Sequence, residues 1–215
     1  MAKTILVIIC SIVVFFIFGL ITFSYKASND LLNAFVQLEK GVGETVSNFE
    51  SKNSKLYSLI NRNSGAKIVS DSIRVKANRA VNYIDNIKYL LVYQSEGNID
   101  NQVVGFDIIY NQGIGNNMLF LIADFRDFIL ENIQDSSTVD FMKSSLNLQP
   151  QYFDGDSVEF LRVIAEHLPM ASVSANLTLY QSYIRNGEAI TISYLASSIT
   201  HAPFEYPIVV LDSLN

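Results

Sequence analysis

The chain has 215 residues, of which 49% are hydrophobic and 17% are charged, and its mean hydropathy is positive. This composition excludes a mainly disordered chain, which would be poor in apolar residues. A single cysteine excludes an internal disulfide, and a net charge of −6 argues against nucleic acid as a partner.

The N-terminal segment predicts a membrane anchor. Residues 4–25 contain no charged side chain. As a helix they would span about 33 Å, which matches a hydrocarbon core of about 30 Å. A cleaved signal peptide has a shorter apolar core, so we interpret residues 1–26 as an uncleaved transmembrane signal anchor. The short N-terminal tail favours an N-terminus inside the cell and a domain outside it.

The predicted membrane helix combines small or hydroxylic residues with an aromatic cluster and has no Asp, Glu, Lys, Arg or His. Small residues let helices approach closely in a membrane. One interpretation is a lipid-facing anchor, and the other is a helix inserted into a partner's membrane bundle. The candidate packing residues are Ser11, Phe15, Phe16, Phe18, Gly19 and Thr22.

Residues 27–201 predict an antiparallel helical bundle. In residues 28–60, apolar residues recur at steps of three and four with one step of seven, which is typical of one helix face. They are Leu31, Phe35, Leu38, Val42, Val46, Phe49, Leu56 and Ile60. No break separates this helix from the membrane helix, and residues 61–65 predict a turn. Residues 67–94 have a heptad-like apolar stripe, so we expect the two helices to pair as an antiparallel hairpin.

The second half of the domain is also predicted to be mainly helical. We expect a structured loop over 96–117, with extended segments at 103–104 and 106–110, and then a helix over 116–134 and a helical turn at 139–146. Another helix starts near Ser157, is interrupted by Pro169 because proline removes a backbone donor, and resumes over 170–198.

The predicted fold is therefore all-α, with one transmembrane helix followed by a bundle of four to five helices. The expected organisation is a membrane anchor over 1–26, a bundle domain over 27–201 and a linker or the start of a further domain over 202–215.

The sequence contains no recognisable catalytic motif. It lacks G-x-S-x-G, H-E-x-x-H, a P-loop and a dinucleotide fingerprint, and its two histidines are not at metal-ligand spacing. We therefore expect no enzymatic activity, metal or cofactor. His167, which stands near Pro169, is expected to bond a freed carbonyl or a neighbouring helix, with a catalytic or pH-sensing role as the alternative.

Charge is distributed unevenly along the predicted domain. Residues 27–95 contain nine Lys/Arg and six Asp/Glu, whereas residues 96–215 contain four and fifteen. Either the two parts pack against each other through this difference, or the acidic part forms a surface for a basic partner.

Two segments resemble the N-terminal part of the GldM/PorM family of gliding-motility and type IX secretion motor subunits. Residues 28–35 (SNDLLNAF) are similar to the family's exit from the membrane. Residues 166–171 (EHLPMA) and 185–189 (RNGEA) are similar to its E-H-x-P-x-A and R-N-x-E-A motifs. The resemblance marks a set of structural motif residues, namely His167, Pro169, Gln181, Arg185, Asn186 and Glu188.

The resemblance implies a homodimeric, single-pass subunit of the bacterial inner membrane with a periplasmic domain. Its two membrane helices would sit in the bilayer inside a pentamer of a two-span GldL/PorL-like protein. The proton motive force would drive motion that this subunit transmits to the periplasm for type IX secretion, gliding motility or both. An arginine usual in the family's membrane helix would fall near Ile8, where this chain has none. The alternative is a non-motor periplasmic scaffold or sensor.

Family members continue into β-rich periplasmic domains. We expect this chain, which ends at Asn215, to be either a shortened form or a short relative.

Overall fold

The computed structural model describes residues 2–61, 64–133, 135–146 and 157–200. For residues 2–25 the description covers the helical backbone and not the side chains. Every regular element in these ranges is helical, which confirms the predicted all-α class. The predicted linker over 202–215 lies outside the described residues.

The predicted membrane segment lies in the part of α1 whose side chains are outside the description. Among the described residues, no helix has the length and apolar character needed to cross a membrane. The packing residues predicted there, Ser11, Phe15, Phe16, Phe18, Gly19 and Thr22, therefore stay predictions.

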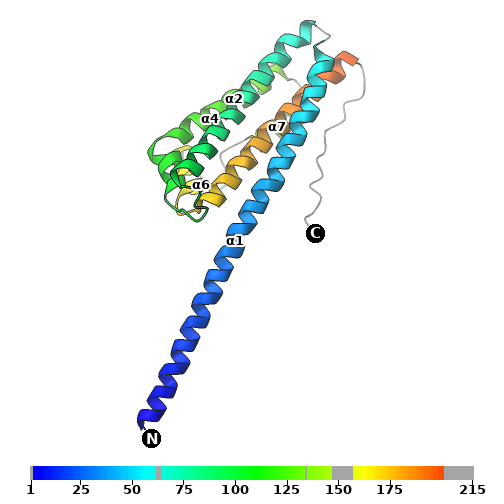
Figure 1. Cartoon of the computed structure of the whole chain (residues 1–215). Coiled ribbons are helices and arrows are strands. Elements are labelled where there is room, and N and C mark those ends of the chain that lie inside the picture. The colour runs from blue at the N-terminus through cyan, green and yellow to red at the C-terminus, as the bar shows by residue number, and fades with distance from the viewer. Residues whose placement is uncertain (1, 62–63, 134, 147–156, 201–215) are drawn as a thin grey trace.

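The first element, α1, is one uninterrupted helix over Ala2–Ile60. This confirms that the helix of the domain continues the predicted membrane helix without a break. Its N-terminal part projects from the bundle, and its C-terminal part lies against the other helices (Figure 1). Of the predicted apolar stripe, Val42, Phe49 and Ile60 are buried. Leu31 and Leu38, nearer the N-terminus, are 56% and 47% exposed.

The helix α2 runs over Ser64–Gln94, close to its predicted bounds. Its predicted stripe is buried, and the residues that form it are Ile73, Ala77, Ala80, Val81, Ile84, Ile87 and Leu91. The predicted hairpin is nevertheless wrong, because α1 and α2 have few contacts with each other. Both pack on α7, Met170–Thr200, which lies between them, and α2 also packs on α4, Ile114–Asn132 (Figure 1).

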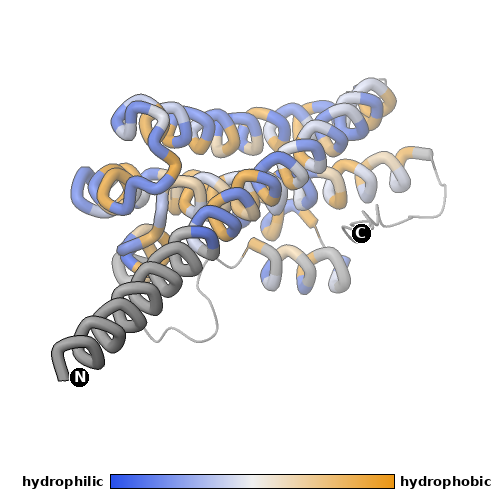
Figure 2. The backbone as a smooth tube through the Cα atoms, turned by 60° about the horizontal axis from the view of Figure 1, so that its bottom comes forward, coloured by the Kyte–Doolittle hydropathy of each residue, from blue (hydrophilic) through white to orange (hydrophobic). Residues whose placement is uncertain are grey.

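The position of α7 explains why the hairpin does not form. Five consecutive residues of α7, 171–175, are buried, so the helix is covered on more than one side. A helix whose buried positions are not confined to one face has to be enclosed by neighbours, and its buried polar groups then need partners on them. The two amphipathic helices α1 and α2 therefore cover α7 and not each other. In Figure 2, apolar and polar residues alternate along the helices of the bundle.

The segment after α2 is helical, which corrects the predicted extended stretches. It forms a short helix α3, Val104–Phe106, and a π-helix η1, Asp107–Asn111. The side-chain oxygen of Asn101 accepts hydrogen bonds from the backbone N–H groups of Val103 and Val104, both at 3.0 Å, which favours the start of a helix. Ile108 and Ile109 are both fully buried, so the helical turn places two adjacent side chains in the core.

The remaining helices agree with the predictions to within a few residues. They are α4 over Ile114–Asn132, α5 over Ser136–Ser145 and α6 over Ser157–Ala165. The chain breaks before Met170, as the position of Pro169 predicts. At this break the N–H groups of Met170 and Ala171 donate to the carbonyls of Asn101 and Ile99, at 2.9 and 3.0 Å. The loop after α2 thus holds the first turn of α7 in place.

Candidate functional site: a buried polar row on α7

Five polar residues form a row along α7. They are Ser174, Thr178, Gln181, Arg185 and Glu188, and all are buried. Their spacing of four, three, four and three places them on one side of the helix. Burying polar groups without partners is costly, so each needs a hydrogen bond inside the bundle. The row finds its partners on α1 and α2.

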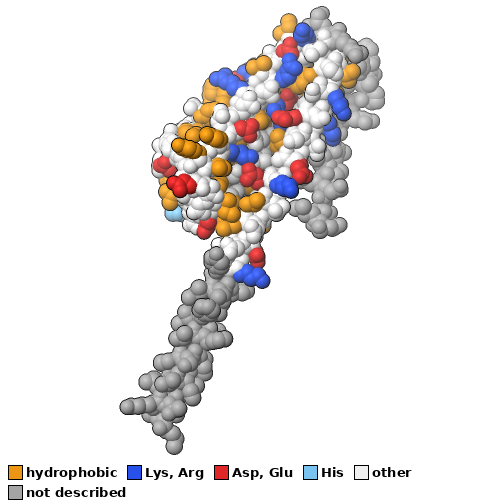
Figure 3. All heavy atoms as spheres, in the orientation of Figure 1, with side chains coloured by type: hydrophobic (Ala, Val, Ile, Leu, Met, Phe, Trp, Pro, Cys, Tyr) orange, Lys and Arg blue, Asp and Glu red, His pale blue; other side chains and the backbone are white. Residues whose placement is uncertain are grey.

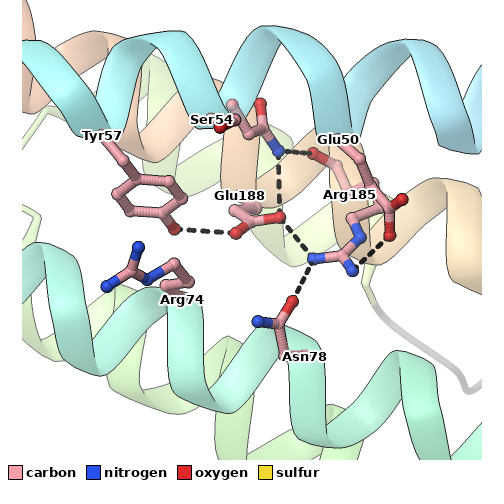
Figure 4. Close-up of a pocket in the computed structure, with 8 residues that line it drawn as sticks. Glu50, Ser54, Tyr57, Arg74, Asn78, Arg185 and Glu188 are labelled. Atoms are coloured by element: carbon pink, nitrogen blue, oxygen red, sulfur yellow. Dashed lines mark hydrogen bonds and ion pairs between the residues drawn. The ribbon is translucent and has the colours of Figure 1, made fainter.

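Glu188 is the centre of the larger of two networks. Its Oε2 accepts hydrogen bonds from Arg185 Nη1 and from Asn53 Nδ2, both at 2.9 Å, and its Oε1 accepts one from Tyr57 Oη at 2.7 Å (Figure 4). The Asn53 amide also donates to the Arg185 carbonyl at 3.2 Å. A buried carboxylate is thereby neutralised by an arginine and held by two groups of α1. We call these residues, together with Glu50 and Asn78, the Glu188 network.

Arg185 connects α7 to both neighbouring helices. Its Nη2 lies 2.5 Å from Glu50 Oε1 on α1, and its Nη1 lies 2.8 Å from Asn78 Oδ1 on α2. The Arg185 side chain is only 6% exposed, whereas the Glu50 side chain is 47% exposed. Two atoms in the network, Asn53 Oδ1 and Arg185 Nε, are buried and have no hydrogen-bond partner. A buried ion pair such as Arg185–Glu188 contributes little net stability, but removing one of its partners leaves the other charge buried and uncompensated.

Tyr57 closes the network next to a polar pocket. Burial, with the carboxylate of Glu188 close to the hydroxyl, raises the pKa of Tyr57 above its ordinary value. The guanidinium of Arg74 lies 5.2 Å from the centre of the Tyr57 ring, which is suitable for a cation–π contact. The pocket has a volume of about 200 Å³, and Arg74, Ser54 and Asn78 line it with the residues above (Figure 4).

A second network lies nearer the start of α7. Glu39 Oε1 on α1 lies 2.9 Å from Lys88 Nζ on α2 and accepts a 2.8 Å hydrogen bond from Ser174 Oγ. Lys88 Nζ also donates to Thr178 Oγ1 at 2.6 Å. We call these residues the Glu39 network. α1 is therefore held by polar contacts at two levels, at Glu39 and at residues 50–57, which are separated by about 16 Å of helix.

Gln181 lies between the two networks. Its Nε2 donates to Asp85 Oδ1 at 2.7 Å and to the Val81 carbonyl at 3.2 Å, both on α2. The residues predicted from the family motif divide into two groups, one on α7 and one in the corner that precedes it. Gln181, Arg185 and Glu188 belong to the polar row, and Asn186 is half-buried beside them on α7.

His167 and Pro169 lie apart from the row, in the corner between α6 and α7. The expectation that His167 bonds a carbonyl or a neighbouring helix is wrong, because its side chain is 89% exposed. Its backbone has a φ of 57°, in the left-handed region, within the turn that follows α6. Histidine is among the non-glycine residues that tolerate this region.

Sequence reasoning missed the partners on α1 and α2, namely Glu39, Glu50, Asn53, Tyr57, Asn78 and Lys88. A signal for two of them was present. Positions 32, 39, 46, 53 and 60 are seven residues apart, and they hold Leu, Glu, Val, Asn and Ile. A polar residue in an otherwise apolar heptad position indicates a specific buried partner.

The outer surface combines both charge signs with exposed apolar side chains. On the face in Figure 3, acidic and basic groups are interspersed, and apolar side chains gather toward the end where α2 terminates. A hollow of about 310 Å³ lies elsewhere, between α2 and α4, where Phe120 is 64% exposed beside Asp124, Asp127 and Glu131. Lys76 from α2 pairs with Asp124 there at 2.7 Å. This pairing agrees with the expectation that the basic and acidic parts pack together.

Comparison with known proteins supports the resemblance seen in the motifs. The profile of the GldM N-terminal domain family matches residues 30–198, which include the whole polar row and most of its bundle. A comparison with curated proteins finds no significant match. Because the family profile covers well over half of the chain, the protein belongs to the GldM family, whose members are components of the gliding-motility and type IX secretion apparatus.

Proposed function

We propose that this chain is a non-enzymatic motor subunit, anchored in the bacterial inner membrane by one N-terminal helix. It transmits motion driven by the proton motive force to the periplasm, for type IX secretion, gliding motility or both. The observation that carries the proposal is the continuity of α1, whose 59 residues form a single helix about 88 Å long. Motion at the N-terminal end of such a helix reaches the bundle without a hinge.

The attachment of α1 supports the same role. Two polar networks join it to α7 and α2, and Val42 and Phe49 pack between them. A lever has to be held at more than one level, because a single contact acts as a pivot. Family membership supports the proposal further, because the profile match covers the part of α1 that carries both networks.

The proposed partners are a second copy of the chain, the lipid bilayer and a pentamer of a two-span GldL/PorL-like protein. Leu31 and Leu38 are exposed, and half-buried Phe35 lies on the same stripe. These three side chains lie on the part of α1 nearest the predicted membrane span. This part of α1 suits contact with the same stretch of a second copy.

An insertion in α1 tests the transmission of motion. Three glycines after Asn29 would place a flexible joint between the predicted span and the bundle. We expect this variant to keep the melting temperature of the domain and to lose type IX secretion and gliding. A helical insertion of seven residues at the same place is the matched control and should retain partial function. Normal secretion with the glycine insertion would contradict the lever role.

The composition of the native complex tests the partners. The mass of the complex extracted from membranes with this chain as bait is expected to correspond to two copies with five copies of a two-span protein. The second candidate function is a periplasmic scaffold or sensor, which the polar pocket beside Arg74 and Arg185 favours. A monomer or a lone homodimer would support this second function and contradict the motor role.

A further inference from the structure

The packing of α1 on α7 has a repeat of seven residues. Buried or half-buried positions on α1 fall at 32, 39, 46, 53 and 60 and again at 42, 49 and 56. Most of these residues are aliphatic or aromatic. When apolar contacts repeat every heptad, a shift by seven residues places similar side chains in similar spaces. Apolar packing alone therefore distinguishes poorly between the observed register and registers shifted by seven residues.

Two of these heptad positions, 39 and 53, are polar. Each finds its hydrogen-bond partners only at its observed position along α7. Asn53 Nδ2 reaches both the Glu188 carboxylate and the Arg185 carbonyl. Glu39 reaches Lys88 and Ser174. A shift of seven residues would move each of them by about 10 Å along α7. Arg185 and Glu188 would then face an apolar residue of α1.

We propose that Asn53, Arg185 and Glu188 are positioning residues that set the register of α1 against α7. A buried asparagine in a coiled coil has this effect, because the competing registers leave polar groups without partners. Tyr57 supports the same register through its bond to Glu188 Oε1. Glu50 pairs with Arg185 from the solvent side and is more exposed than Arg185 and Glu188.

The consequence for motion rests on the proposed function, whereas the assignment of register does not. If α1 is a lever, its register decides which residues of α7 it pushes on when the predicted membrane segment moves. The Glu188 network then transmits this displacement to α7 and, through Asn78, to α2. The loop carbonyls of Ile99 and Asn101 hold the other end of α7.

A variant with apolar replacements tests the proposal on the full chain in detergent. It combines Asn53→Leu, Tyr57→Phe, Arg185→Met and Glu188→Leu, so that no buried charge is left alone. Replacing buried ion pairs by apolar residues of similar size commonly preserves stability. We therefore expect an unchanged or higher melting temperature together with a loss of the single register.

The register is measured as the distance between two spin labels, one at Ser51 on α1 and one at Asn117 on α4, in a Cys10→Ser background. Both label sites are exposed. The native sequence should give one narrow distance. The variant should add a second population in which α1 has moved by about 10 Å, the length of seven helical residues. The paired control, Lys76→Met with Asp124→Leu, removes a contact between α2 and α4 and should keep the single distance.

A single unchanged distance in the apolar variant would overturn the proposal. If that variant does not fold, Asn53→Leu alone decides the question, because Glu188 keeps its bonds to Arg185 and Tyr57. Asn53→Leu is also expected to add the second distance population, and a single unchanged distance in this variant would reject the register role. Loss of secretion with unchanged distances would also reject this role and leave the proposed function standing. Failure of the motor proposal would instead appear in the mass of the native complex, which the distance measurement does not involve.

Discussion

Tyr57 and Glu188 are 131 residues apart in the sequence and share a 2.7 Å hydrogen bond. The Tyr57 hydroxyl, near the end of α1, donates to Oε1 of Glu188 within α7, and both side chains are buried. The bond connects the helix that enters the bundle from the N-terminal side to the helix on which both α1 and α2 pack. It also means that the carboxylate depends on α1 for part of its stabilisation.

Removing the Tyr57 hydroxyl should therefore destabilise the bundle. In Tyr57→Phe the Glu188 oxygen loses a donor in a buried place, and an unsatisfied buried group costs about 1–3 kcal/mol. Urea denaturation at pH 7 measures the free energy of unfolding. The control is Tyr89→Phe, at an exposed tyrosine, which should change little. Equal effects of the two substitutions would contradict the buried bond.

The stability of the protein should also decline at alkaline pH. Burial raises the pKa of Tyr57 and of Tyr180 above the ordinary value of 10.0. The folded protein thus keeps protons that the unfolded chain releases, so the stabilisation is complete below pH 10 and is lost as the pH rises above it. Denaturation between pH 8 and pH 11 should show a falling free energy of unfolding, with a shallower fall in Tyr57→Phe. A flat profile in the native protein would contradict both shifts.

Arg185 and Gln181 should respond very differently to the same substitution. Arg185→Leu leaves Glu188 buried without its cation, and breaking a buried pair costs about 3–5 kcal/mol. Gln181→Leu releases Asp85, which is exposed and can be hydrated, so its cost should stay below about 1 kcal/mol. Thermal denaturation of the two variants measures this difference. A small decrease in melting temperature for Arg185→Leu would show that water reaches Glu188.

Two glycines should give opposite results when replaced by alanine. A Cβ at Gly115 would lie 2.7 Å from the Ile109 carbonyl oxygen and from Leu161 Cδ2, so Gly115→Ala should destabilise by about 1–3 kcal/mol. At Gly41, within α1, a Cβ meets no atom within 4 Å. Gly41→Ala should stabilise by up to about 1 kcal/mol, because alanine favours helix. The order of melting temperatures checks both statements.

His167 should tolerate replacement by glycine better than by any branched residue. Its φ of 57° is unfavourable for residues with a Cβ, and its side chain is exposed. We expect His167→Gly to preserve or raise the melting temperature, and His167→Val to lower it. If His167→Gly were strongly destabilising, the imidazole would have a contact that its exposure does not indicate.

Much of the fold follows from local patterns that the sequence displays. The apolar steps of three and four in α2 and α4 predict helices at nearly the observed bounds, and Pro169 predicts the break before α7. The motif residues between 181 and 189 also predict the family and three members of the polar row, Gln181, Arg185 and Glu188. These features depend on side chains near one another in the chain, where periodicity and backbone chemistry are sufficient.

The pairing of helices was decided only by tertiary structure. The stripes of α1 and α2 are compatible with a hairpin, and no local rule shows that α7 is covered on more than one side and has to lie between them. The segment at 106–110 reads as extended because Ile108 and Ile109 are adjacent β-branched residues, yet packing in the core favours a π-helical turn. The heptad position of Asn53 indicates a buried partner, but only the packing of α1 on α7 decides that this partner is Glu188.

What the sequence by itself determined is the set of long helices, the break at Pro169 and the family to which the chain belongs. Which faces meet, and therefore where the buried charge of Glu188 is compensated, was decided by tertiary structure. The physical reason is that helix formation is encoded in neighbouring residues, whereas the enclosure of α7 depends on the combined apolar surface of several helices. Polar partners are then selected by whichever side chains this enclosure brings within hydrogen-bonding distance.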